Sequence, residues 1–363
     1  MRILHIMGSA DAGGIAAVVY NYMRFIDQDK FHFDFALTGG SLGMLGNKMI
    51  DAGAKCYYLP RIHDGIKDFL SQLSKLLRRE HFDAIHVHVN SNSWIALSVA
   101  KDEGIKIRIA HAHYAGKPES ARNWIIMKLG HILNQRYATH LVGCGQLAGE
   151  TVFGKSFTRS KKHLVLPNAI DAGKFRYNQD VREEVRRELG IEQKYVIGLI
   201  GRLSAQKNQA FIMPVISKLH QLIPDMVFML VGTGEDESIL KDYCREHFME
   251  SYVIFTGVRQ DVYRIYQGVD VCLLPSLYEG FPVVGVEAIA SGCPLLLSDC
   301  ITHELSFGTY VKYLPLEEDA WLNALKSKPM NNNRDKGICE IKEHGFDIVD
   351  SSKILEHIYL DIR

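Results

Sequence analysis

Two series of short, almost continuously apolar segments constrain the fold of this chain more than any other feature. Between them lie stretches with the 3.6-residue apolar period of amphipathic helices. Strands that are apolar on both faces are typical of a parallel sheet covered by helices, and this alternation predicts βαβ units. The first series comprises residues 2–7, 32–37, 56–59, 84–89, 107–111 and 140–144, and the second comprises residues 196–201, 227–231, 253–257, 271–275, 294–298 and 311–314.

A loop and a charged helical stretch, at about residues 168–194, separate the two series. Because single cores stop growing at about 250–300 residues, a chain of 363 residues is expected to form two domains. We therefore expect an α/β protein with two doubly wound domains, residues 1–170 and 171–345, that face each other across a cleft. Residues 346–363 have apolar side chains at helical spacing and are expected to cross back to the N-terminal domain as a helix.

Charge is distributed unevenly between these two regions, although the net charge is zero. Residues 1–170 hold 21 Lys and Arg against 13 Asp and Glu, whereas the remainder holds 21 against 29. Opposite charges on the two halves indicate separate domains with different binding partners. We do not expect nucleic acid to be one of these partners.

The cysteines and the apolar runs bear on the expected compartment. Seven cysteines, none of them in a C-x-x-C pair, favour free thiols in a reducing environment and do not predict a zinc site. The first apolar run is too short for a signal peptide, and no run reaches the roughly 18–20 residues that cross a bilayer. We therefore expect a cytoplasmic protein that associates at most peripherally with a membrane.

The most informative motif is the segment 274–294, which follows a predicted strand, turns at Glu279 and Gly280 and continues as a helix from about Pro282. Free N–H groups at such a helix start attract phosphate. Glu279 can accept hydrogen bonds from sugar hydroxyls, and Glu287, which has apolar neighbours, can bind a ribose diol. The alternative is that Glu279 caps the helix and that Glu287 is a solvated surface charge.

A second motif, the segment 201–208 (GRLSAQKN), follows the first predicted strand of the second domain. Its cations Arg202 and Lys207 can hold a diphosphate and stabilise the charge that grows on it as it departs. The alternative is two surface bases at a helix start. Cations there oppose the helix dipole, and a bound anion would resolve that conflict.

Glycines mark two further loops that follow predicted strands. Gly13 and Gly14 would let the backbone approach a ligand closely, although they do not form the G-x-G-x-x-G fingerprint. Gly232 begins a Gly-Thr-Gly-Glu segment that is expected to lie at the edge of a nucleotide. A plain tight turn is the alternative for both loops.

Two pairs of histidines, at positions 86 and 88 and at positions 111 and 113, lie at the ends of predicted strands. Residues two apart on a strand share a face, so each pair could bind a metal ion. No acidic partner is evident nearby, and we therefore predict no metal site. We interpret His113, at the carboxyl end of its strand, as a residue close to a bound sugar.

The Gly-Arg-Leu and Lys of the segment 201–208, followed by Glu279-Gly-Phe-Pro-x4-Glu287, resemble the retaining glycosyltransferases of family four. These enzymes have the GT-B fold of two Rossmann-like domains. The resemblance extends over nearly the whole chain, and its specific part is the pair of glutamates with the upstream Arg and Lys. The amino-acid sequences of several segments are similar to those of bacterial exopolysaccharide and capsular polysaccharide glycosyltransferases. One departure is Ala169, which stands where many relatives have glycine.

This resemblance implies a role for each motif. Arg202 and Lys207 would hold the donor diphosphate, Glu287 the ribose and Glu279 the donor sugar, while His113 would line the reaction centre of an acceptor-binding first domain. The other expected substrate contacts are Gly13, Gly14, Asn168, Gly201, Gly232, Gly280, Phe281, Pro282 and Val283.

The implied activity is the transfer of a hexose-type sugar, with retention of configuration, from a nucleotide-diphosphate sugar to a glycan or lipid-linked acceptor. UDP is the commonest donor nucleotide among the relatives, and bacterial surface polysaccharide is the expected product. No metal or other cofactor is expected, because the enzymes of this family are generally metal-independent. The leaving phosphate would assist deprotonation of the acceptor, so no pair of carboxylates is needed. The alternatives are a GT-B-fold epimerase or phosphorylase and a non-catalytic sugar-nucleotide-binding subunit.

The segment 117–136 is expected to form an amphipathic helix in which bases such as Arg122 and Lys128 surround an apolar face. Each base near an anionic leaflet adds about 1 kcal/mol of attraction. This pattern predicts peripheral docking to the inner membrane surface. A helix packed in the core, with solvated bases, is the alternative.

Overall fold

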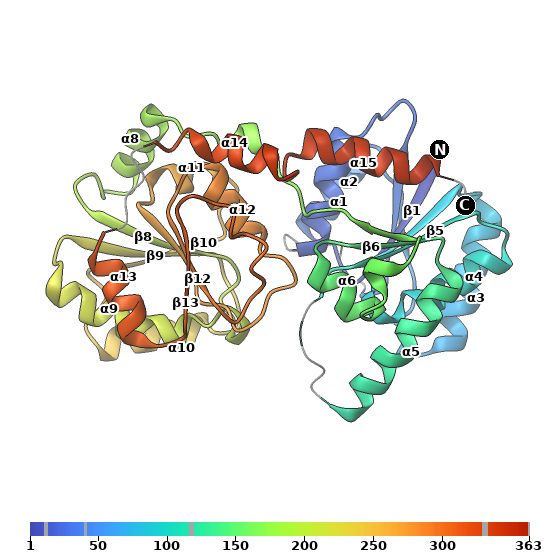
Figure 1. Cartoon of the computed structure of the whole chain (residues 1–363), viewed down its shortest axis with the longest axis horizontal. Helices are drawn as coiled ribbons and strands as arrows, with labels where there is room; N and C mark the ends of the chain where they lie inside the picture. Colours follow the sequence, from blue (N-terminus) through green and yellow to red (C-terminus); the bar gives the residue numbers. More distant parts are fainter. Residues whose placement is uncertain (11–13, 40–41, 115, 117–119, 329–332, 362–363) are drawn as a thin grey trace. The chain divides into compact units, whose positions relative to one another are not determined.

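The computed structural model describes residues 1–10, 14–39, 42–114, 116, 120–328 and 333–361. The chain divides into two compact units (Figure 1). Unit 1 comprises Met1–Ile170 and Asp347–Arg363, and unit 2 comprises Asp171–Phe346. Each unit has its own parallel sheet and its own helices, as the alternating apolar segments predict.

Unit 1 is built on a seven-stranded parallel sheet in the order β3-β2-β1-β4-β5-β6-β7. The chain order reverses between β1 and β4, which is where ligands bind in sheets of this kind. Six of the strands match the predicted series, whereas β7 has only three residues and was not predicted. The strands are β1 (Arg2–Met7), β2 (His32–Leu37), β3 (Cys56–Tyr58), β4 (Ala84–Val87), β5 (Ile107–Ala112), β6 (His140–Gly143) and β7 (His163–Val165).

The last helix of the chain belongs to unit 1. Helix α15 (Ile348–Leu360) packs against α1, and its apolar residues Leu355, Ile358 and Tyr359 are part of the core that includes β1 and β2. The remaining helices of unit 1 are α1 (Gly14–Phe25), α2 (Gly43–Asp51), α3 (Ile66–Glu80), α4 (Ser93–Asp102), α5 (Ala121–Tyr137) and α6 (Gln146–Phe153), with 3-10 turns η1 (Asn90–Asn92) and η2 (Phe157–Arg159).

Unit 2 is built on a six-stranded parallel sheet in the order β10-β9-β8-β11-β12-β13. All six strands were predicted, and the ends of each lie within a residue of the predicted ends. The strands are β8 (Tyr195–Ile200), β9 (Met226–Val231), β10 (Val253–Gly257), β11 (Val271–Leu274), β12 (Leu295–Ser298) and β13 (Val311–Leu314). The helices are α7 (Ala172–Phe175), α8 (Gln179–Glu188), α9 (Gln209–Leu222), α10 (Glu237–Glu246), α11 (Val262–Gly268), α12 (Val283–Ala290), α13 (Glu318–Lys326) and α14 (Lys336–Glu343), with the 3-10 turn η3 (Ala205–Lys207).

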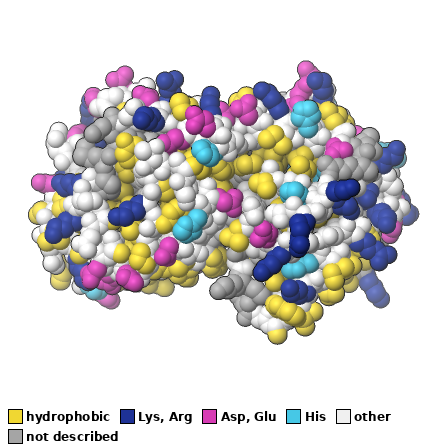
Figure 2. All heavy atoms as spheres, viewed as in Figure 1, with side chains coloured by type: hydrophobic (Ala, Val, Ile, Leu, Met, Phe, Trp, Pro, Cys, Tyr) yellow, Lys and Arg dark blue, Asp and Glu magenta, His cyan; other side chains and the backbone are white. Residues whose placement is uncertain are grey.

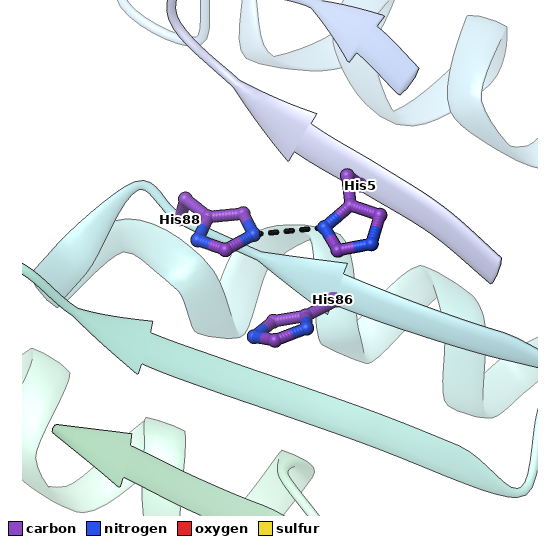
Figure 3. A group of neighbouring side chains, drawn as sticks. All are labelled: His5, His86 and His88. Carbon is purple, nitrogen blue, oxygen red and sulfur yellow. Dashed lines mark hydrogen bonds between the residues drawn. The ribbon is translucent and has the colours of Figure 1, made fainter. Parts of the chain in front are cut away.

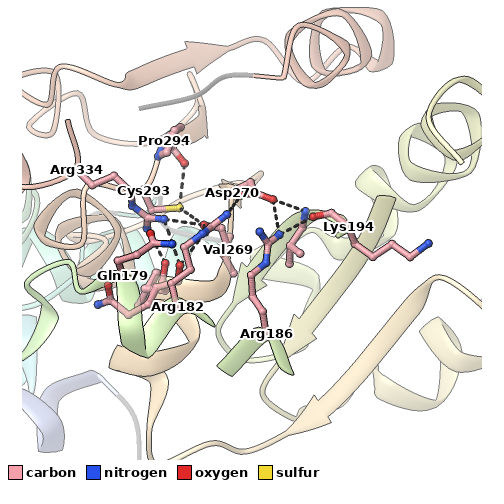
Figure 4. A network of polar contacts seen from close by, with 12 residues as sticks. Gln179, Arg182, Arg186, Lys194, Val269, Asp270, Cys293, Pro294 and Arg334 are labelled. Carbon is pink, nitrogen blue, oxygen red and sulfur yellow. Dashed lines mark hydrogen bonds and ion pairs between the residues drawn. The ribbon is translucent and has the colours of Figure 1, made fainter. Parts of the chain in front are cut away.

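A buried polar network fastens α8 to the sheet of unit 2 (Figure 4). Asp270 forms ion pairs with Arg182 and Arg186 of α8, and it also accepts a hydrogen bond from the backbone of Val196 at 2.7 Å. Arg334 donates to the backbone carbonyls of Tyr266, at 2.7 Å, and of three other residues. Since buried charges must be paired or hydrogen-bonded, the network locks the amino-terminal edge of the sheet.

Within the described residues, none of the helices combines the length and the apolar character that crossing a membrane would need.

Candidate functional site

The two motif loops of unit 2 follow adjacent strands, β8 and β11, and are hydrogen-bonded to each other. The backbone N–H of Leu277 donates to the carbonyl of Gln206 at 2.9 Å, and the Gln206 side chain donates to the carbonyl of Tyr278 at 2.9 Å. Asn208, which has a left-handed backbone with φ of 56°, donates to the carbonyl of Pro275 at 3.1 Å. These hydrogen bonds join the two loops where they follow strands β8 and β11.

Lys207 and Glu279 form an ion pair between these two loops. The Lys207 Nζ atom lies 2.6 Å from Glu279 Oε1, and only 16% and 9% of the two side chains is exposed. An ammonium group has three donors, so Lys207 can pair with Glu279 and also hold an anion. The structure thus brings together two residues that the sequence places 72 positions apart.

Arg202 lies in a different environment. Its Nε atom is 2.9 Å from Glu235 Oε2 in the loop after β9, and its side chain is 73% exposed. Its backbone carbonyl accepts a hydrogen bond from the Gln209 side chain, which fixes the loop while the guanidinium stays at the surface. An exposed pair of this kind contributes little to stability, so its guanidinium is available to a ligand.

Close contact between backbone segments explains two of the predicted glycines. Gly201 and Gly232 have φ angles of +145° and +131°, a region that side chains disfavour. A Cβ atom at Gly232 would lie 2.1 Å from the carbonyl oxygen of Gly201. The loops after β8 and β9 can therefore touch only because residue 232 is glycine.

Helix α12 begins at Val283, and Pro282 is its N-cap rather than its first helical residue. Pro282 provides no side-chain cap, and its carbonyl accepts from the backbone of Gly285 at 2.9 Å. Phe281 is buried and stacks on Phe346 with ring centroids 5.1 Å apart. The loop that carries Glu279 and Gly280 is thereby anchored directly ahead of the helix.

Glu287 is not a solvated surface charge. It is partly buried, and its Oε2 atom accepts a hydrogen bond from Tyr266 at 3.0 Å. Burial raises the pKa of Glu287 to about 7, an effect that the Tyr266 hydrogen bond and the charges of Lys174 and Lys207 partly offset. The Tyr266 hydroxyl also lies 3.0 Å from the carbonyl of Val284, so its single proton is shared between this carbonyl and the carboxyl group. Sequence analysis missed Tyr266, and no local motif marks it.

The other predicted residues lie in unit 1. Gly14 begins α1 with φ of +42°, and Gly13 lies outside the described residues. Asn168 is buried in the loop after β7, and its Oδ1 atom has no hydrogen-bond partner among the described residues. The backbone N–H of His113, just after β5, donates to Asn90 Oδ1 at 2.8 Å.

His113 belongs to a cluster of five histidines. The other members are His5, His86, His88 and His111, each at most 3% exposed. Figure 3 shows three of them, with rings from β1 and from the end of β4 turned toward one another. Burial lowers the pKa of His5 and of His113 to about 3 and lowers the pKa of the other three as well. The five imidazoles are therefore neutral near pH 7.

Two trios within this cluster have the spacing of metal ligands, which the sequence did not predict. One comprises His5, His86 and His88, and the other comprises His88, His111 and His113, with ligand atoms within 4.8 Å of one another. Neither trio contains a carboxylate or a thiolate. Imidazole nitrogens of this cluster already form hydrogen bonds of 2.9–3.1 Å to one another, and a metal ion would have to replace these bonds.

Comparison with known proteins assigns the class. The two doubly wound units have the GT-B fold: HepE of Anabaena, in a crystal structure with UDP, matches 98% of this chain with 99% of its own at a TM-score of 0.81 and 18% identity. The family "Glycosyl transferases group 1" matches residues 181–306, which include the two hydrogen-bonded loops after β8 and β11 and helix α12.

Two relatives match most of the chain. An uncharacterized glycosyltransferase of Haemophilus influenzae is 32% identical over 300 residues, which are 81% of this chain and 79% of the relative. The UDP-Gal:alpha-D-GlcNAc-diphosphoundecaprenol alpha-1,3-galactosyltransferase of Escherichia coli is 25% identical over all of this chain and 97% of its own. The protein belongs to the group 1 glycosyl transferases, and an epimerase, a phosphorylase or a non-catalytic subunit is not favoured.

Proposed function

We propose that unit 2 binds a nucleotide-diphosphate sugar, with UDP as the nucleotide, and that the protein transfers a hexose from it with retention of configuration. The observation that carries this proposal is the buried Lys207–Glu279 pair on the two hydrogen-bonded loops, together with the partly buried Glu287 on α12, which Tyr266 contacts. The pair lies at the carboxyl edge of a parallel sheet, where ligands bind in this class of fold.

In this proposal each side chain meets one part of the donor. Lys207 and the exposed Arg202 hold the two phosphates, and they stabilise the charge that accumulates when the sugar leaves. Glu279 keeps Lys207 in place and accepts from a sugar hydroxyl. Glu287, oriented by Tyr266, binds the ribose diol. The departing phosphate takes the acceptor proton, so no second carboxylate is needed.

The acceptor is proposed to be a glycan or a lipid-linked sugar in bacterial surface polysaccharide synthesis, bound by unit 1. This follows from the family resemblance and from the lipid-linked acceptor in the name of the Escherichia coli relative. His113 and Gly14 are proposed to line the reaction centre, and Asn168 offers a buried amide oxygen to a substrate.

The test is product analysis with purified enzyme, a panel of nucleotide sugars and undecaprenyl-diphosphate-linked sugars. Transfer from a UDP-hexose, with an anomeric proton coupling that matches the donor, is the expected result. Donor turnover with inverted configuration would contradict retention. Isomerised donor without transfer would contradict the activity itself.

We further propose that α5 docks on an anionic membrane on the cytoplasmic face. Its residues Trp124, Ile125, Leu129 and Ile132 are between 51% and 69% exposed, so this apolar face is not part of the core of unit 1. Lys128 lies over the Trp124 ring at 5.6 Å. In Figure 2, basic and hydrophobic spheres lie next to each other where Figure 1 shows this helix. Apolar area plus basic charge is the combination that binds anionic leaflets.

Flotation with vesicles that contain phosphatidylglycerol tests the docking. We expect co-flotation at low salt that Trp124→Ser together with Ile132→Ser abolishes. The matched control is Ile239→Ser on α10 of unit 2, where a 64% exposed isoleucine lies outside the docking helix. Equal flotation of the double variant, or none by the parent protein, would rule α5 out as the docking surface.

A further inference from the structure

A row of hydrogen bonds connects His113 with four other histidines and with Tyr359 in unit 1. It leads from His113 through His88 and His5 to the hydroxyl of Tyr359, and from there through His86 to His111. In that order the donor–acceptor distances are 2.9, 3.0, 3.4, 2.9 and 3.1 Å. Strands β1, β4 and β5 and helix α15 each contribute to this row.

Each of the three histidine–histidine joints pairs an Nε2 atom with an Nδ1 atom, and the Tyr359 hydroxyl lies between His5 Nε2 and His86 Nδ1. His88 receives His113 at Nδ1 and reaches His5 from Nε2, and His5 in turn uses Nδ1 toward His88 and Nε2 toward Tyr359. On the other arm, His86 contacts Tyr359 through Nδ1 and His111 through Nε2. The imidazoles are therefore connected head to tail.

Each ring in this row has one N–H group and one bare nitrogen, because a neutral imidazole carries a single ring proton. Burial lowers the pKa of all five histidines, and no carboxylate among the described residues takes part in these bonds. A joint holds only when one side donates and the other accepts. The proton position on one ring therefore fixes the proton position on the next.

We infer that these five histidines and Tyr359 form one hydrogen-bonded chain with a single proton polarity, and that His88, His5 and Tyr359 are positioning residues for His113. A hydroxyl can accept two hydrogen bonds, so an arrangement in which Tyr359 accepts from both His5 and His86 would leave its own proton without a partner in the row. Two states satisfy every joint and also use that proton. In one, all five rings carry the proton on Nδ1 and the Tyr359 hydroxyl donates to His5; in the other, all five carry it on Nε2 and the hydroxyl donates to His86.

The two ends of the chain differ. At one end, Nε2 of His111 is buried without a hydrogen-bond partner among the described residues. At the other end, His113 is partly exposed and its Nδ1 is the terminal atom. In one state His113 offers an N–H group there, and in the other it offers an acceptor. The chain therefore decides whether His113 donates to or accepts from a sugar hydroxyl, a consequence that rests on the proposed function.

The tautomers can be read from the ligand-free protein by NMR with ¹⁵N-labelled histidine, in which long-range couplings show which nitrogen carries the proton. Substituting each of the five histidines in turn assigns their signals. We expect all five rings in the same tautomer at about pH 7. A mixture of Nδ1–H and Nε2–H rings among the five would overturn the inference.

The variant Tyr359→Phe removes the joint between the two arms without removing a ring. We expect it to change the tautomer population of His113 and to lower kcat about tenfold, as for the loss of one hydrogen bond, with the donor KM within about twofold. The matched control is Tyr195→Phe, which removes a buried hydroxyl that donates to the Leu325 carbonyl in unit 2. An unchanged tautomer of His113 in Tyr359→Phe would contradict the inference that the hydrogen bonds through Tyr359 set the proton position on His113. The NMR result does not require turnover, so it stays interpretable if the proposed transfer activity is wrong.

Discussion

The proposed donor site of unit 2 and the histidine chain of unit 1 are assembled in opposite ways. In unit 2, the polar groups come from two loops on adjacent strands, and each loop is a recognisable motif of the sequence. In unit 1, the chain joins residues as far apart as His5 and Tyr359, which are 354 positions apart. A motif can be recognised from the spacing of residues within one segment. A row of hydrogen bonds that crosses several strands depends on the register of those strands.

The largest expected effect tests the centre of the donor site. Lys207→Ala should lower kcat/KM by about 10²–10³, the usual cost of removing one fixed group that stabilises developing charge. It also leaves Glu279 buried without its cation, so thermal unfolding should be measured beside the kinetics. Glu279→Gln keeps the shape of the side chain but removes its charge. It therefore separates the loss of stability, caused by an unpaired buried charge, from the loss of activity.

Lys218→Ala is the control for this substitution. Lys218 also pairs with a glutamate, Glu318 at 2.7 Å, but both side chains are at least 40% exposed on the surface of unit 2. We expect its kcat/KM to stay within about twofold, because exposed pairs contribute little. A Lys207→Ala enzyme that keeps more than a tenth of its activity would show that the motif does not form the site.

A smaller effect tests the close backbone contact beneath the site. Gly232→Ala should lower the free energy of unfolding by about 2–4 kcal/mol, since it combines an unfavourable φ with a steric clash. Gly190→Ala provides the comparison, because Gly190 also has a positive φ, +65°, but has open space around a Cβ atom. Urea unfolding should show a clearly larger loss at position 232; equal losses would mean that the loops can separate.

The smallest effect concerns Glu287 and depends on pH. Because burial raises the pKa of Glu287 from 4.5 to about 7, the folded protein holds a proton that the unfolded chain loses between these values. The free energy of unfolding therefore falls as the pH rises through this window. Glu287→Gln removes the titration and keeps an acceptor for Tyr266.

We expect Glu287→Gln to be more stable than the parent protein by about 1–3 kcal/mol near pH 8 and to be nearly equal to it near pH 5. Urea unfolding at the two pH values measures this difference. A difference that is the same at both values would show that Glu287 ionises normally in the folded protein. Substituting the exposed Glu246, which lies at the end of α10, is the control.

The strands were predictable because a strand that is buried on both faces of a sheet has an almost continuous run of apolar residues. Strand β7 escaped because its three residues are only partly buried or exposed, at the edge of the sheet. The start of α12 agrees with the expected start at about Pro282, since proline suits both the N-cap and the first turn. The apolar neighbours of Glu287 mark it as an unusual position for a surface charge, and its role in binding stays a prediction. Its partner Tyr266 was not predicted, because nothing in the sequence pairs α11 with α12.

The amino-acid sequence by itself determined the two parallel sheets, the family and the segments that carry the charged groups. The apolar runs and the individual motifs are patterns within short segments, and they can be read from the sequence without knowledge of any long-range contact. Only the tertiary structure decided that Lys207 meets Glu279, that Arg202 faces Glu235 and that four strand-end histidines join His5 and Tyr359. Those pairings depend on strand register and helix packing, where a shift of one residue would turn each side chain to the other face.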